Sequence, residues 1–144
     1  ANYFRANPKD TVSTIQGKKC WTLSPHEKNP KVSFLDIWVN YDEWRFGRIP
    51  NVKISLEYLD EGKGSIEVIY DSQDDTQKKL DTIMLSGSST WKTWTREVDD
   101  AMFACSIAQP YRNDDLVFVT RTTKPLSVAR VSITRGTVKG PMTR

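Results

Sequence analysis

The chain has 144 residues, with 21 Lys and Arg against 18 Asp and Glu, for a formal net charge of +3. This length is sufficient for one domain with its own core, without help from metals or several disulfides. The two signs of charge are interspersed, and no basic block provides the electrostatic footprint of a nucleic-acid binder. No apolar run approaches the roughly 20 residues of a membrane span. No secretory signal segment is recognisable either.

Along the chain, about nine short segments alternate apolar with polar residues, and Pro, Gly and polar residues separate them, as in all-β domains. The expected strands are Tyr3–Ala6, Lys19–Leu23, Val32–Asn40, Val52–Leu59, Ser65–Tyr70, Leu80–Leu85, Trp91–Val98, Asp115–Thr120 and Ser127–Thr134. This series predicts a two-sheet antiparallel β-sandwich. We favour a jelly-roll topology, because long loops between some strands suit crossings from sheet to sheet. The domain should cover residues 1–136, and residues 137–144 read as a C-terminal tail or linker.

The segment Val52–Asp71 has the most regular pattern of the chain and predicts a β-hairpin. Alternation runs through Tyr58, breaks at Asp60–Gly64 and resumes at Ile66. Glycines at 62 and 64 can adopt the positive φ angles that a short turn needs. Two such strands are not stable alone in water, so their apolar face must cover a second sheet.

The inward faces of these strands define a predicted core. In Val32–Asn40 the aliphatic positions share one face and the aromatic and polar positions share the other. The predicted core residues are Leu35, Ile37, Val39, Ile54, Leu56, Tyr58, Ile66, Val68, Val131 and Ile133.

Signals for catalysis and metal binding are weak. The single histidine, His26, lies in a proline-flanked loop, so any Ser-His-Asp or Cys-His arrangement would depend on it alone. Strand carboxylates that alternate with apolar residues are typical of a solvated sheet face. Cys20 and Cys105 are either one long-loop disulfide of a secreted protein or two free thiols. Cysteine spacing typical of a zinc site is absent.

Three sequence elements point to a family. They are the turn Tyr58–Gly64, the strand end Tyr70–Ser72, and the stretch from Trp-Lys-Thr to Asp-Ala-Met-Phe at Trp91–Phe103. With the closing strand around Arg130–Ile133, the chain resembles the galactose-binding-like β-sandwich modules attached to polysaccharide-degrading enzymes. One departure is Arg96, where such modules tend to have an aromatic residue.

The resemblance implies a non-catalytic, secreted, monomeric carbohydrate-binding module that binds a polysaccharide and targets an attached glycoside hydrolase or lyase to it. No cofactor is expected. Sandwiches of this kind often hold a structural calcium ion, for which Asp71, Asp74 and Asp75, or Asp99 and Asp100, could supply ligands. Two alternatives stay open: a bracing module that binds nothing, and a small jelly-roll polysaccharide lyase.

Aromatic placement predicts where a sugar would bind, because pyranose rings stack their C–H faces on aromatic rings and their hydroxyls need planar polar partners. The polar and aromatic face of Val32–Asn40, the adjoining loop Tyr41–Pro50 and a loop at residues 111–114 have this character. The expected carbohydrate-binding residues are Phe34, Asp36, Trp38, Tyr41, Trp44, Arg45, Tyr111 and Arg112. Arginines 45, 48 and 112 favour an acidic or sulfated glycan.

The tryptophans are expected to divide between these roles. Trp44, in a loop, is predicted to bind ligand and to contribute little to stability. Trp91, Trp94 and Trp21 are predicted to pack in the core or at its edge, so that Trp91→Ala would cost about 3–5 kcal/mol of stability.

Overall fold

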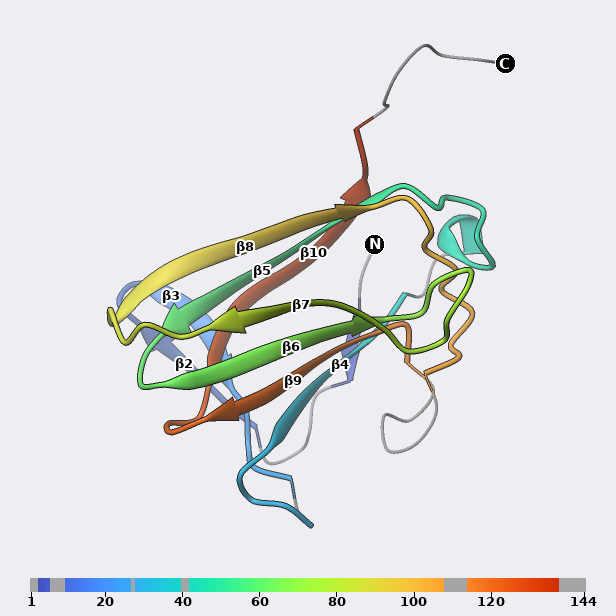
Figure 1. The fold of residues 1–144 in the computed structure, drawn as a ribbon. Coiled ribbons are helices and arrows are strands. Elements are labelled where there is room, and N and C mark those ends of the chain that lie inside the picture. Colours follow the sequence, from blue (N-terminus) through green and yellow to red (C-terminus); the bar gives the residue numbers. More distant parts are fainter. Residues whose placement is uncertain (1–2, 6–9, 27, 40–41, 108–113, 138–144) are drawn as a thin grey trace.

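The computed structural model describes residues 3–5, 10–26, 28–39, 42–107 and 114–137. In these residues the chain forms two five-stranded antiparallel sheets stacked face to face (Figure 1), which confirms the predicted sandwich. The strands are β1 Tyr3–Arg5, β2 Thr11–Ile15, β3 Lys18–Thr22, β4 Ser33–Trp38, β5 Val52–Asp60, β6 Gly64–Tyr70, β7 Lys78–Met84, β8 Thr90–Val98, β9 Leu116–Thr122 and β10 Ser127–Arg135. In the same described residues one 3-10 turn, η1, covers Asp42–Trp44. No helix in this part of the chain is both long and apolar enough to span a membrane.

The strand order is β1-β4-β9-β6-β7 in one sheet and β2-β3-β10-β5-β8 in the other. The sequence did not predict β2, although its Thr-Val-Ser-Thr-Ile segment is rich in β-branched residues. Thr11 to Thr14 are all exposed, so this edge strand lacks the alternation that marks a half-buried strand.

The predicted hairpin over Val52–Asp71 is wrong in its pairing. β5 pairs with β8 and β10, whereas β6 pairs with β7 and β9. The turn at residues 61–63 therefore carries the chain from one sheet to the other. The inward faces of β5 and β6 then face each other across the interior instead of lying side by side. Among consecutive strands in the described residues, only β2–β3 and β6–β7 pair directly.

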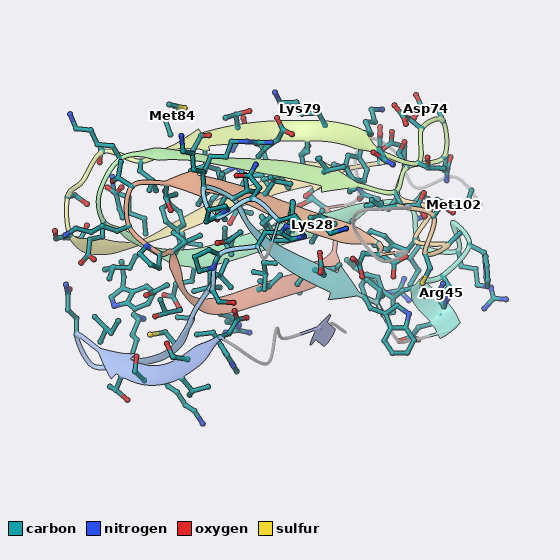
Figure 2. The ribbon with its side chains drawn as sticks, turned by 90° about the horizontal axis from the view of Figure 1, so that it is seen from below. Lys28, Arg45, Asp74, Lys79, Met84 and Met102 are labelled. Carbon is teal, nitrogen blue, oxygen red and sulfur yellow. The ribbon has the colours of Figure 1, made fainter. Side chains whose placement is uncertain are left out.

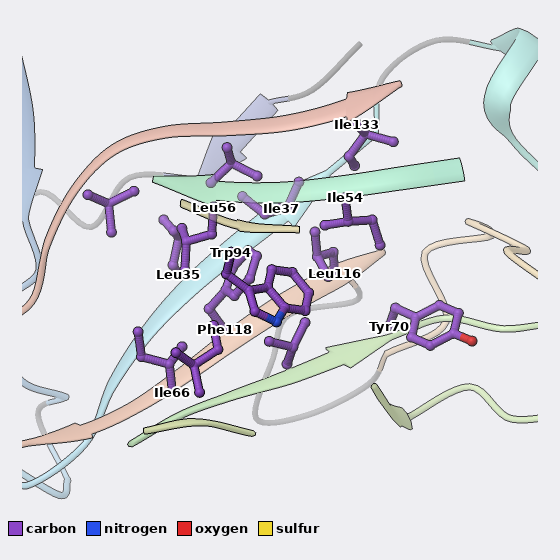
Figure 3. Packing of buried hydrophobic residues seen from close by; sticks show 14 of the residues in the cluster. Leu35, Ile37, Ile54, Leu56, Ile66, Tyr70, Trp94, Leu116, Phe118 and Ile133 are labelled. Carbon is purple, nitrogen blue, oxygen red and sulfur yellow. The ribbon is translucent and has the colours of Figure 1, made fainter. Parts of the chain in front are cut away.

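All ten predicted core residues are buried, which confirms the reading of the inward faces. The sheets are joined by aliphatic residues of β4, β5, β6 and β10, with Trp94 of β8 between them (Figure 3). The Trp94 ring meets Phe118 of β9 edge to face, with centroids 6.2 Å apart and an interplanar angle of 89°. Such a pair adds about 0.5–1.5 kcal/mol beyond its buried area.

Asp60, at the end of β5, is fully buried and organises the connection between β7 and β8. Its carboxylate accepts hydrogen bonds from the backbone amides of Ser86, Gly87 and Ser88 at 2.8, 3.2 and 3.2 Å. The same carboxylate also accepts hydrogen bonds from the hydroxyls of Ser86 and Ser88 at 2.5 and 2.7 Å, and it lies 2.9 Å from the Lys92 ammonium. Burial alone would raise the pKa of Asp60, but the donors outweigh it and hold this pKa well below its usual range.

The first prediction concerns the two tryptophans of β8. Trp94→Ala should lower the free energy of unfolding by about 3–5 kcal/mol, because it removes a buried ring from the sheet-to-sheet layer. Trp91 is only half-buried, and its indole donates to the Ile15 carbonyl at 3.1 Å across the β2 end. Trp91→Ala should therefore lower the free energy of unfolding by clearly less than Trp94→Ala does. It should also cost less than the about 3–5 kcal/mol expected for Trp91→Ala from the sequence. Urea unfolding of both variants measures the difference, and equal losses would contradict the assignment of Trp94 to the core.

The second prediction concerns Asp60. Asp60→Asn keeps the shape but removes the charge, and should lower the free energy of unfolding by about 1.5–3 kcal/mol, the range for hydrogen bonds to charged groups. The folded-state pKa lies below the ordinary 3.8. The stabilisation is thus complete at neutral pH and decreases as pH falls below about 4. Thermal unfolding from neutral to acidic pH measures this. A difference between the two proteins that does not change with pH would contradict it.

Candidate functional site

Three connections meet at one end of the sandwich: those between β4 and β5, between β6 and β7, and between β8 and β9. Backbone hydrogen bonds join them, from Gly47 to Met102 and from Gln73 to Asp100, both at 2.8 Å. Figure 2 shows Arg45, Met102 and Asp74 at this end. The structure thus joins the predicted loop at Arg45–Arg48 to the connections after β6 and β8.

Arg45 fastens this loop end to the body of the domain. Its guanidinium donates to the Val39 carbonyl at 2.8 Å and to the Cys105 sulfur at 2.9 Å, and lies 3.5 Å from the Asp115 carboxylate. The Arg45 side chain is 13% exposed and that of Asp115 is 0% exposed. The Arg45 guanidinium is therefore engaged mainly inside the protein, and its contact with a ligand stays a prediction.

The carboxylate of Asp115 links two of the three connections. It accepts the backbone amides of Val39 and Cys105 at 2.8 and 2.7 Å. Burial raises the pKa of Asp115, although these amides and Arg45 oppose the shift. Nearby, buried Asp71 accepts the amides of Ala104 and Ser106 at 2.8 and 3.2 Å, and burial raises its pKa as well. These carboxylates fix the backbone of the loop after β8.

Trp44 is buried rather than exposed. Its side chain retains 7% exposure and belongs to the main core cluster, since η1 directs it inward at the end of the sandwich. The prediction that Trp44 offers a free ring face to a sugar is thus wrong.

Among the described residues of this loop, the exposed aromatic ring is that of Phe46, which was not among the residues predicted from the sequence. Its side chain is 60% exposed, and its φ of 56° is unusual for a residue with a side chain. The guanidinium carbons of Arg45 and Arg48 lie 5.3 and 5.8 Å from the ring centroid. Gly47, with φ of 73°, completes the turn. In the sequence, the pattern of an aromatic residue directly before a loop glycine could have pointed to Phe46.

The outer face of β4 is not the open aromatic patch that was predicted. Asp36 is 7% exposed, and Phe34 and Trp38 are only partly exposed. Phe34 meets the His26 ring edge to face at 5.1 Å, and packs against a second apolar cluster. That cluster consists of Val32, Ile69, Ile107, Val117 and Val119. The loop before β4 therefore covers part of this face. Tyr41, Tyr111 and Arg112 lie outside the described residues.

The groups considered for catalysis or metal binding have protein partners. His26 Nδ1 accepts the Lys28 amide at 3.2 Å. Lys78 lies 3.3 Å from the Asp74 carboxylate and 2.6 Å from that of Asp100. In the described part of the chain, no three His, Cys, Asp or Glu side chains are grouped to hold a metal ion. Cys20 and Cys105 are free thiols in the structure.

A depression of about 290 Å³ lies on the outer face of the β5–β8–β10 sheet. Its lining is polar and consists of Ser55, Glu57, Thr93, Arg130 and Ser132. Lys18 of the β2–β3 hairpin reaches Glu57 at 3.0 Å beside it. No aromatic side chain lines this depression, whereas the loop end offers the exposed ring of Phe46.

A third prediction follows from the positions of Trp44 and Phe46. Trp44→Ala should lower the free energy of unfolding by about 3–5 kcal/mol, because it empties part of the core. Phe46→Ala should change it by less than about 0.5 kcal/mol, as exposed substitutions usually do. Urea denaturation of both variants measures this. If Phe46→Ala were as destabilising as Trp44→Ala, the exposed position of the ring would be wrong.

No protein-family pattern and no curated protein matches the sequence, but solved structures resemble the fold. A family 6 carbohydrate-binding module whose binding sub-sites were dissected by crystallography and calorimetry has a TM-score of 0.51 and 14% identity, over 94% of each chain. A module from Clostridium stercorarium in complex with cellobiose has a TM-score of 0.46 and 10% identity, over 94% of this chain and 87% of its own. A family 29 carbohydrate-binding module from Piromyces equi has a TM-score of 0.46 and 14% identity, over 92% and 77%. The chain thus has the β-sandwich fold of the family 6 carbohydrate-binding module.

Proposed function

We propose that the chain is a non-catalytic carbohydrate-binding module that binds a polysaccharide and targets an attached glycoside hydrolase or lyase to it. The observation that supports this most is the exposed ring of Phe46 on a firmly anchored loop. We define the Phe46 platform as Phe46, Arg48 and Gln73. The side-chain nitrogen of Gln73 lies 3.4 Å from where a Cβ on Gly47 would stand.

The chemistry of the Phe46 platform suits a pyranose. The ring supplies a flat apolar area for the sugar C–H face, and the guanidinium and amide groups supply planar donors for hydroxyls. The turn at Phe46 and Gly47 is held by the hydrogen bond from Gly47 to Met102, so little freedom is lost on binding. The left-handed backbone at Phe46 costs stability, and such strain is concentrated at functional positions.

The remaining parts of the proposal concern the context of the module. We infer a secreted, monomeric domain without a cofactor, in which Tyr41, Tyr111, Arg112 and Trp38 also contact the glycan. Asp36 is proposed only as a supporting residue, because it is buried.

A fourth prediction tests the proposal. Affinity electrophoresis over plant, algal and microbial polysaccharides should show retention on at least one. Phe46→Ala should weaken that retention by about 30-fold, the loss expected of a 2 kcal/mol hot spot. Met84→Ala, which removes another exposed apolar side chain on β7, is the matched control and should have no effect.

The other outcomes separate the alternatives. Undiminished retention of the Phe46→Ala variant would move the site elsewhere on the domain. No retention on any polysaccharide would favour the bracing role. Release of reducing ends or unsaturated products would identify a lyase or hydrolase instead.

A further inference from the structure

A groove of about 670 Å³ lies at the opposite end of the sandwich from the Phe46 platform. Its walls come from the start of β6, the end of β9 and the turn before β4. β6 runs from this groove to the platform end, a length of roughly 20 Å at about 3.3 Å per residue. We call this site the basic groove. Its polar and charged lining residues are Asn29, Lys31, Lys63, Arg121, Thr122 and Thr123.

The basic groove concentrates positive charge in a chain whose total charge is nearly balanced. Three cations line it and no carboxylate does. In the described residues five other lysines, at 18, 78, 79, 92 and 124, form ion pairs with carboxylates. For the three groove cations, no carboxylate of the described residues lies within ion-pair distance. A concave site lined by one sign of charge focuses its field on an approaching ligand.

Two walls of the basic groove are locked together. The Lys63 amide donates to the Thr123 hydroxyl at 2.9 Å, and the Thr123 amide donates to the Lys63 carbonyl at 2.8 Å. Gly64, with φ of 128°, lies so close to β9 that a Cβ would stand 2.1 Å from the Arg121 carbonyl. Lys63 and Arg121 are thus carried by directly adjoining, fixed backbones.

The third wall is a tight turn that presents Lys31. The Val32 amide donates to the Asn29 carbonyl at 3.1 Å, and the Lys31 amide donates to the Asn29 side-chain oxygen at 3.2 Å. Pro30 stands at the turn position that favours its fixed φ. The His26 amide ties this turn to the loop by donating to the Val32 carbonyl at 2.7 Å. The side-chain amide nitrogen of Asn29 can then donate a hydrogen bond to a sugar oxygen.

We propose that the basic groove is a second glycan-binding site, selective for the anionic groups of a polysaccharide, either sulfate esters or uronate carboxylates. One guanidinium and two ammonium groups suit such oxygens. A nucleic acid fits less well, because no aromatic side chain lines the groove to stack a base. An anionic membrane also fits less well, because none of the large exposed apolar side chains of the described residues, Val12, Phe46 and Met84, lines the groove.

The test compares two triple variants with the same loss of charge. K31Q/K63Q/R121Q neutralises the groove, whereas K19Q/K53Q/R135Q removes three positive charges from other strands. Isothermal titration calorimetry with dextran sulfate, polygalacturonate and neutral dextran measures binding at several salt concentrations.

We expect at least one anionic polymer, and not neutral dextran, to bind the native chain. The groove variant should weaken its Kd about tenfold or more, and the control by less than about twofold. The slope of log K against log salt should fall by about 2 in the groove variant only.

Other outcomes would overturn the proposal. Equal losses in both triple variants would show general charge attraction. A DNA oligonucleotide that binds as tightly, with the same dependence on the groove residues, would show a site for polyanions in general. If the groove variant does not fold, Lys31→Glu serves instead, because Lys31 lies outside the Lys63–Thr123 lock, and unchanged affinity there would refute the site. The groove substitutions should weaken dextran sulfate binding by the same factor in the Phe46→Ala background, which distinguishes a failure here from a failure of the Phe46 platform.

Discussion

The face-to-face packing of β5 on β6 is the contact on which the rest of the sandwich depends. Ile54 and Leu56 of one strand are fully buried opposite Ile66 and Val68 of the other, and each such side chain contributes about 1.5–3 kcal/mol. Because these neighbouring strands belong to different sheets, each must recruit hydrogen-bonding partners from distant parts of the chain. The turn between them thus sets both the separation of the sheets and the crossing topology of the fold.

Buried carboxylates then fix the loops that this topology leaves at the two ends. Asp60 holds the connection between β7 and β8, while Asp115 and Asp71 hold the backbone around Val39 and Cys105. A buried carboxylate that accepts several backbone amides is costly to remove, because the amides lose their partner. The loop end that carries the Phe46 platform is accordingly fixed by buried carboxylates, whereas the basic groove is held by the paired hydrogen bonds between Lys63 and Thr123.

The sequence allowed the inward faces to be predicted but not the pairing. Alternation is local, so Ile54, Leu56 and Ile66 could be assigned to the core, whereas pairing of β5 with β10 depends on residues about 75 positions away. Local sequence patterns were equally insufficient for the candidate site. Trp44 and Phe46 stand two residues apart in one loop, and only the turn geometry decides which ring is buried. Phe46, the better candidate, was therefore missed, and Asp36 was expected on a face that the chain itself covers.

The position of β10 has a consequence for how the protein is made. This last strand, Ser127–Arg135, lies in the middle of its sheet, between β3 and β5. During synthesis, β5 can pair with β8 but lacks its other neighbour until Arg135 has left the ribosome, so an apolar strand edge stays open throughout. Unpaired edges of this kind favour aggregation and slow, late completion of folding. Nascent chains that stop short of Ser127 should consequently remain substrates for chaperones rather than adopt a partial sandwich.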